Sequence, residues 1–143
     1  MTFDAGSGPK VGLVTDKGVI DLTDRLGVLS LKNLIANQQF NEVPTNTNEG
    51  ADYHLSEIKF LPVIPDPEHI FCIGTNYADH LQEAIDAGLP RSKTEHPPLF
   101  LRFSDTLVGH AQPLLKSPRV KQLDYECELA VIISILGRYF TEE

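Results

Sequence analysis

The chain has 143 residues, of which 41% are hydrophobic, and its 20 acidic and 12 basic residues give a formal net charge of −8. This length and composition fit one ordinary soluble, globular domain and exclude disorder throughout. The acidic balance, without any cluster of Lys and Arg, argues against nucleic acid or an anionic membrane as a partner. Small molecules or cations are better candidates.

The cysteines and the first residues bear on the compartment. Cys72 and Cys127 lie far apart within apolar runs, which predicts buried, unpaired thiols in a reducing compartment. The opening MTFDAGSGPK has no apolar signal core, and no run approaches the length of a membrane span. We therefore expect a cytoplasmic protein.

The first part of the chain reads as a small α/β module over residues 1–62. Residues 11–22, VGLVTDKGVIDL, predict a β-hairpin that turns at Gly18, because glycine accepts the positive φ of a tight turn. Ser30 can cap a short helix, LKNLIANQ. Residues 41–52 are polar and predict a surface loop, and three prolines in LPVIPDP mark the boundary to a second part over residues 63–143.

The second part begins with the pattern of a buried strand, HIFCIG. A helix of about eleven residues should follow, with Asn76 as N-cap and Gly88 as its stop. A proline-bounded loop, residues 89–98, leads to a strand in LFLRF, and the last strand is expected over residues 123–134, LDYECELAVIIS.

Three carboxylates alternate along this last segment. On a strand Asp124, Glu126 and Glu128 would share one face, with the glutamate Cα atoms roughly 6.6 Å apart. A hard cation bound through oxygen would relieve their repulsion, and such ligands favour Mg²⁺, Mn²⁺ or Ca²⁺. The alternative is an exposed edge strand whose acids face water.

Two further candidates lie upstream. His80 and Glu83 are one helical turn apart, so Glu83 could orient the imidazole and make His80 a general base, although a solvated surface pair has the same spacing. Arg102 is a single charge amid Leu and Phe, suited either to a substrate carboxylate or to a nearby acid.

Taken together, IFCIGTNYADHLQEA, PPLFLRFSDTLVGH and QLDYECELAVIISILGR resemble the fumarylacetoacetate hydrolase family across nearly the whole chain. The resemblance implies an α+β protein in which the small module precedes a mixed β-sheet, β-roll catalytic domain. It also implies that this domain continues beyond residue 143, so we expect an N-terminal portion of a longer protein. Tyr139 to Glu143 begin like a helix without a body, or form a frayed polar tail.

The same resemblance implies site roles. Glu126 and Glu128 would bind Mg²⁺ or Mn²⁺, with a third carboxylate beyond residue 143. His80 would be the base and Glu83 its partner, and Arg102 would help to bind substrate.

The implied function is hydrolytic cleavage of a carbon–carbon bond in a small 2-oxo or diketo acid, such as an acylpyruvate, through a metal-stabilised enolate. Oxo-acid decarboxylase, isomerase and hydratase activities are alternatives within this chemistry, and a homodimer is expected for the full-length protein. A catalytically inactive truncated or regulatory fragment is the rival interpretation.

Overall fold

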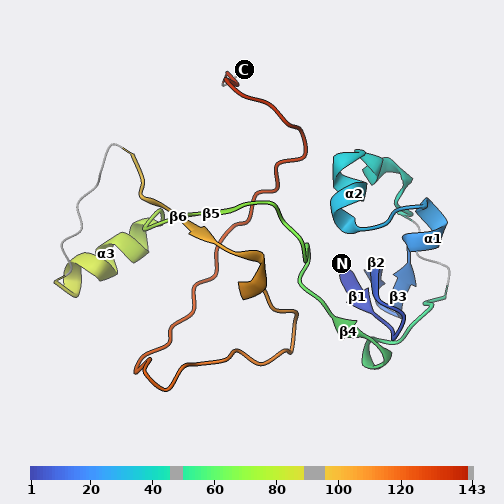
Figure 1. Ribbon diagram of the computed structural model, residues 1–143, viewed down its shortest axis with the longest axis horizontal. Coiled ribbons are helices and arrows are strands. Elements are labelled where there is room, and N and C mark those ends of the chain that lie inside the picture. Colours follow the sequence, from blue (N-terminus) through green and yellow to red (C-terminus); the bar gives the residue numbers. More distant parts are fainter. Residues whose placement is uncertain (46–49, 89–95, 142–143) are drawn as a thin grey trace. The chain divides into compact units, whose positions relative to one another are not determined.

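The computed structural model describes residues 1–45, 50–88 and 96–141 (Figure 1). These residues contain helices and two antiparallel sheets, so the fold is mixed α/β. The chain divides into two compact units: Met1–Pro65 with Val108–Glu143, and Asp66–Leu107. Each unit is described by itself, and the predicted boundary between residues 62 and 63 stays a prediction.

The first unit is built on a four-stranded sheet of order β3-β2-β1-β4. Its strands are β1 (Thr2–Asp4), β2 (Pro9–Thr15), β3 (Gly18–Asp21) and β4 (Lys59–Phe60). The predicted hairpin is confirmed, since Thr15 pairs with Gly18, whose φ is 136°. Glycine suits this position because a side chain there would be strained.

Two short helices, α1 (Thr23–Leu26) and α2 (Leu31–Ala36), accompany this sheet (Figure 1). The predicted cap of α2 is confirmed, because the Asn33 N–H donates to Ser30 Oγ at 3.1 Å. Five buried side chains form the core between sheet and helices, namely Val11, Ile20, Leu22, Val28 and Leu34. The apolar alternation of the hairpin therefore builds the hydrophobic centre of the unit.

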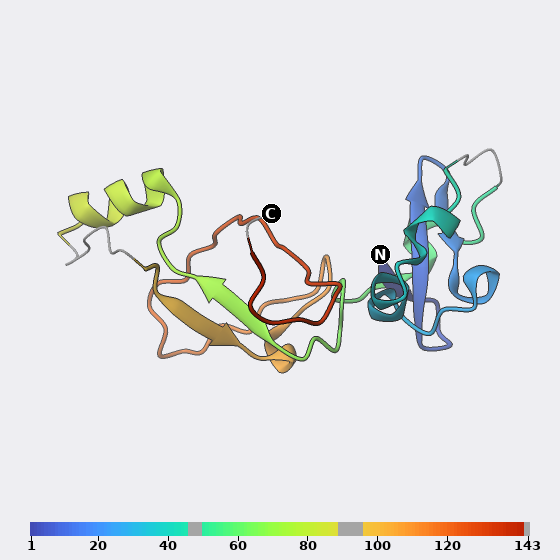
Figure 2. The same ribbon diagram turned by 90° about the horizontal axis from the view of Figure 1, so that it is seen from above.

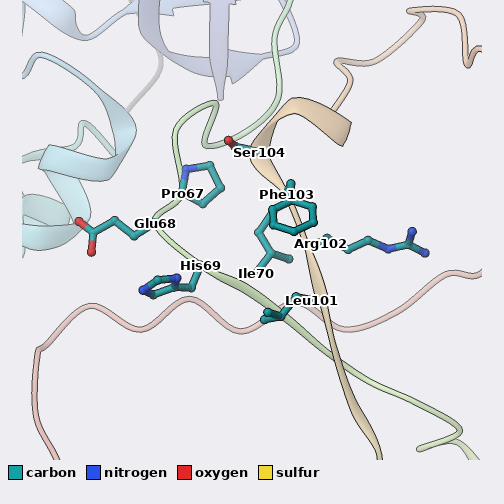
Figure 3. Close-up of a pocket in the computed structure, with 8 residues that line it drawn as sticks. All are labelled: Pro67, Glu68, His69, Ile70, Leu101, Arg102, Phe103 and Ser104. Atoms are coloured by element: carbon teal, nitrogen blue, oxygen red, sulfur yellow. The ribbon is translucent and has the colours of Figure 1, made fainter.

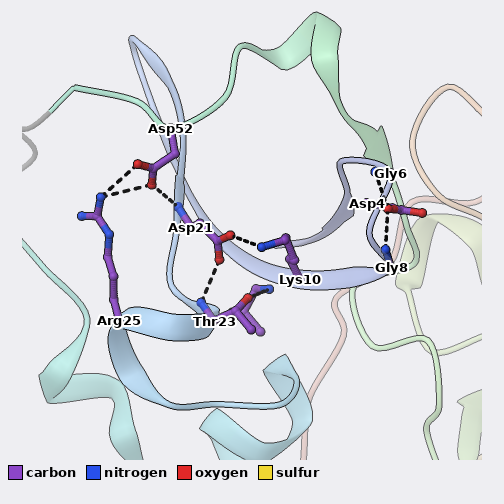
Figure 4. Close-up of polar contacts among 9 residues, drawn as sticks. Asp4, Gly6, Gly8, Lys10, Asp21, Thr23, Arg25 and Asp52 are labelled. Atoms are coloured by element: carbon purple, nitrogen blue, oxygen red, sulfur yellow. Dashed lines mark hydrogen bonds and ion pairs between the residues drawn. The ribbon is translucent and has the colours of Figure 1, made fainter.

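Ion pairs and hydrogen bonds fix the exit of β3 (Figure 4). Lys10 Nζ lies 2.6 Å from Asp21 Oδ2, and the Thr23 N–H donates to Asp21 Oδ1 at 2.9 Å. Burial by itself would raise the pKa of Asp21, but the hydrogen bonds from Lys10 and Thr23 outweigh it and lower that pKa. The hydrogen bond to Asp21 raises the pKa of Lys10. Both directions indicate a charged pair that the fold stabilises.

Asp52 links the loop before β4 to the same region. Its Oδ2 accepts the Asp21 N–H at 2.7 Å, and both of its carboxylate oxygens lie 3.1 Å from Arg25 Nη2 (Figure 4). The predicted loop over residues 41–52 is supported at its described ends, which contain only a 3₁₀ turn at Gln39–Glu42, while residues 46–49 lie outside the described residues.

The chain returns to this unit after residue 107. A Cβ added at Gly109 would overlap the Phe60 carbonyl oxygen, and the His110 ring packs edge-on against the Phe60 ring at 5.1 Å. Only glycine fits at so close an approach to backbone. From there to Thr141 the described chain contains no helix or strand (Figure 2).

The predicted strand over residues 123–134 is therefore wrong for this structure. The residue pattern of this segment is compatible with a strand, but a strand also needs a neighbour to pair with. The described chain pairs no strand with this segment, and its apolar side chains are exposed, among them Leu129 at 83% and Val131 at 77%.

The second unit contains β5 (Ile70–Ile73), α3 (Ala78–Asp86) and β6 (Leu99–Arg102). The two strands pair antiparallel, with Ile70 opposite Arg102 and Ile73 opposite Leu99. Both predicted strands are confirmed. The prediction that β5 is buried is wrong, since Phe71 is 65% exposed. The physical reason is that a two-stranded sheet alone cannot cover both of its faces.

Two smaller predictions also need correction. The N-cap of α3 is Tyr77, without a side-chain cap hydrogen bond, rather than Asn76, and the helix has nine residues. The predicted stop is confirmed, because Gly88 has φ 72° and its N–H donates to the Ile85 carbonyl. Both cysteines are free, as expected, but neither is buried, since Cys72 is partly exposed and Cys127 is exposed.

At nine residues, α3 is the longest helix in the described part of the chain, and no helix there is long and apolar enough to cross a membrane.

Candidate active site

His80 and Glu83 are carried by α3, which follows β5 after a sharp turn. The Gly74 N–H donates to the Pro98 carbonyl at 2.8 Å and ties the end of β5 to the residue before β6. Thr75 then takes a φ of 55°, which is rare for a β-branched residue and reverses the chain toward the helix. The residue type of Thr75 gives no signal for this turn, after which α3 starts at Ala78.

On α3, His80 is half-buried and Glu83 is exposed, one turn further on. Residues three apart on a helix are neighbours, so the carboxylate lies within reach of the imidazole. Ala84, 7% exposed, is the one buried residue of the helix. This arrangement can accept a proton at His80 and stabilise the imidazolium through Glu83.

Arg102 ends β6 in the same unit. With Pro67, Glu68, His69, Ile70, Leu101, Phe103 and Ser104 it lines a shallow hollow of about 140 Å³ (Figure 3). Figure 3 shows the His69 ring and the Arg102 side chain extending to opposite sides of the strand pair. Arg102 therefore lines the hollow together with an acidic residue, Glu68.

Glu126 and Glu128 lie in the first unit, on the irregular and exposed segment. The neighbouring Asp124 turns back on its own backbone, since its Oδ1 accepts the Tyr125 N–H at 2.8 Å. Glu126 and Glu128 are two residues apart in the sequence, but in the structure they do not lie on a strand.

The donor chemistry of the two glutamates suits a hard divalent cation, because carboxylate oxygens are what Mg²⁺ and Mn²⁺ prefer. Within residues 1–45, 50–88 and 96–141, no group of three His, Cys, Asp or Glu side chains is close enough to hold a metal. The role of Glu126 and Glu128 as metal ligands therefore stays a prediction.

The predicted site residues fall into two sets. His80, Glu83 and Arg102 belong to the unit Asp66–Leu107, whereas Glu126 and Glu128 belong to the other. The structure describes the geometry of each set within its own unit, and the assigned roles stay predictions.

Comparison with known proteins covers most of this region. Residues 69–143 match the family model described as fumarylacetoacetate (FAA) hydrolase C-terminal. The chain is 42% identical over 93 residues to oxaloacetate tautomerase YisK of Bacillus subtilis, a match that covers 64% of this chain and 30% of that protein. It is 34% identical over 84 residues to the mitochondrial oxaloacetate tautomerase Fahd2a of Rattus norvegicus, covering 59% and 25%.

A solved structure, that of an HpcE-like protein from Mycobacterium smegmatis, superposes with a TM-score of 0.56 at 24% identity and covers 82% of this chain and 41% of that one. That likeness concerns the fold. The chain spans between a quarter and about two fifths of the proteins it matches. Because the family model covers more than half of the 143 residues, the chain belongs to the fumarylacetoacetate hydrolase family.

Proposed function

We propose that the protein acts on a small 2-oxo acid of the oxaloacetate type and interconverts its keto and enol forms. The observation that carries this proposal is the family match together with curated relatives, bacterial and mitochondrial, that are named oxaloacetate tautomerase. Since this chain spans less than a third of those relatives, the activity belongs to the whole protein and is a proposal for it.

His80 would move the proton. In its neutral form the imidazole accepts a proton from the carbon beside the 2-oxo group, and the imidazolium returns it to the oxygen, so that a keto acid becomes its enol. Glu83, one turn away on α3, would stabilise the imidazolium and hold the ring in orientation. Both side chains are carried by one helix, α3.

Glu126 and Glu128 would hold a divalent cation, Mg²⁺ or Mn²⁺, with Ca²⁺ as a further candidate. When bound, such a cation supplies Lewis-acid polarisation of the substrate's 2-oxo group. The role of the two glutamates is to bind it through carboxylate oxygen.

Hydrolytic carbon–carbon cleavage is the second candidate, and the His80–Glu83 pair favours it because the same base can take a proton from water. The hydroxide would add to the distal carbonyl, the bond from that carbonyl carbon to its neighbour would break, and the bonding electrons would pass to the neighbouring carbon. Protonation of that carbon completes the hydrolysis.

One assay separates the candidates. The protein is mixed with oxaloacetate or an acylpyruvate, with Mn²⁺ or with a chelator, and enol absorbance and pyruvate release are followed in the same samples. Tautomerisation predicts that the enol and keto forms reach equilibrium faster than in buffer, with no pyruvate released beyond the buffer level. Cleavage predicts metal-dependent release of pyruvate. Rates equal to buffer with every substrate would contradict both and favour the inactive fragment.

A further inference from the structure

Phe100 and Arg102 share one face of the β5–β6 sheet. The register places Ile70 opposite Arg102 and Cys72 opposite Phe100, while Phe71 lies opposite Leu101. Side chains alternate along a strand, so Phe100 and Arg102 project from the same side and Leu101 from the other. The carbon at the centre of the guanidinium, Cζ, lies 5.4 Å from the centroid of the Phe100 ring.

This distance is within the range of a cation–π contact, in which the positive charge rests on the electron-rich ring face. The ring engages the guanidinium through its charge, so the N–H donors stay available for other partners. Among the described residues, the Arg102 side chain makes no hydrogen bond or ion pair. Of the two readings that its sequence context allows, pairing with a nearby acid thus finds no support in the described part of the chain.

The chain has 20 acidic residues, yet the described contact of the Arg102 guanidinium is with the Phe100 ring and not with an acid. Its planar fork matches a carboxylate in a bidentate pair, which a lysine ammonium cannot reproduce. Arg102 also lines the hollow at the start of β5 and the end of β6, together with the apolar Ile70 and the acidic Glu68.

We propose that Phe100 is a positioning residue that holds the Arg102 guanidinium as a receptor for a carboxylate of the small oxo-acid substrate. The identity of the ligand as an oxo acid rests on the proposed function. The contact between Phe100 and Arg102, and the affinity of Arg102 for a carboxylate, do not. Stacking restricts a long side chain before the ligand arrives, so less conformational freedom is lost on binding.

The test measures oxalate affinity by calorimetry for the wild type and four variants, and it follows the Arg102 Nε–H signal by NMR in those variants that keep Arg102. Phe100→Leu should weaken oxalate about two- to fivefold, the equivalent of an exposed cation–π contact, and should move the Nε–H signal even without ligand. Phe100→Tyr should restore both, because the ring face remains. Arg102→Lys should weaken binding more than Phe100→Leu does.

Phe71→Leu is the matched control, since it removes an exposed ring from the opposite face of the same sheet and should leave oxalate affinity unchanged. Equal affinities and equal Nε–H shifts for Phe100→Leu and wild type would overturn the proposal. In the turnover assay Phe100→Leu should raise KM while kcat is kept. Wild-type protein that binds oxalate through Arg102 but turns over no oxo acid would refute the proposed function and leave the carboxylate receptor standing.

Discussion

Replacing Gly12 by alanine tests how tightly the sheet of the first unit is packed around this residue. A Cβ at Gly12 would lie 2.6 Å from Val19 Cγ1 and 2.8 Å from Phe3 Cε1, closer than such atoms approach in proteins. Phe3 and Val19 are both 0% exposed, and the Phe3 ring packs edge-on against Tyr53 at 5.5 Å, so neither neighbour can swing into solvent. The sheet itself must shift.

Overpacking of this kind costs about 1–3 kcal/mol. Urea unfolding followed by circular dichroism should therefore move the midpoint of Gly12→Ala down by roughly 1 M, given usual urea dependences for small domains. Gly50→Ala is the control, because nothing lies within 4 Å of its added Cβ and its φ is not in the left-handed region. Its stability should stay the same or rise by about 0.4–1 kcal/mol. Equal midpoints for the two variants would refute the packing described for Gly12.

Two other predictions concern charge. The pKa of Asp21 is lowered in the folded protein, so its contribution to stability is fully present above the ordinary carboxyl pKa and is lost as the pH falls through the folded-state pKa. Asp21→Asn should therefore lose less stability than the wild type in this acid range. An unchanged profile of stability against pH would contradict the ion pair with Lys10. The raised pKa of Lys10 acts at the other end, since its contribution is lost as the pH rises through the folded-state value. At the proposed metal ligands, Glu126→Gln or Glu128→Gln should abolish Mn²⁺ binding in calorimetry, while Asp105→Asn should keep it. Full Mn²⁺ affinity in both glutamate variants would remove the assignment.

Local chemistry accounts for the elements that could be predicted. The hairpin follows from Gly18 between two apolar runs, and α2 follows from Ser30, because turn and cap preferences act over a few residues. The strands β5 and β6 likewise carry their signal in short runs bounded by glycine and proline.

The failures have a common cause in tertiary context. The alternation of residues 123–134 is typical of a strand, but pairing depends on a neighbour that no local pattern encodes. The helix α3 begins one residue later than the sequence predicts, after a turn in which Thr75 adopts the left-handed region that its residue type disfavours. The contact between Phe100 and Arg102 could have been suspected from their spacing of two on a strand, although the stacking itself needs coordinates.

The most direct test of the central claim is enolisation of a 2-oxo acid by His80. Deuterium uptake from D₂O at the carbon beside the 2-oxo group is followed by proton NMR, with Mn²⁺ and oxaloacetate, for the protein and for His80→Gln. We predict that the protein accelerates uptake over buffer and that His80→Gln loses about 10²- to 10⁴-fold of this rate while still binding Mn²⁺. Uptake by the protein no faster than in buffer, or unchanged uptake in His80→Gln, would contradict the account.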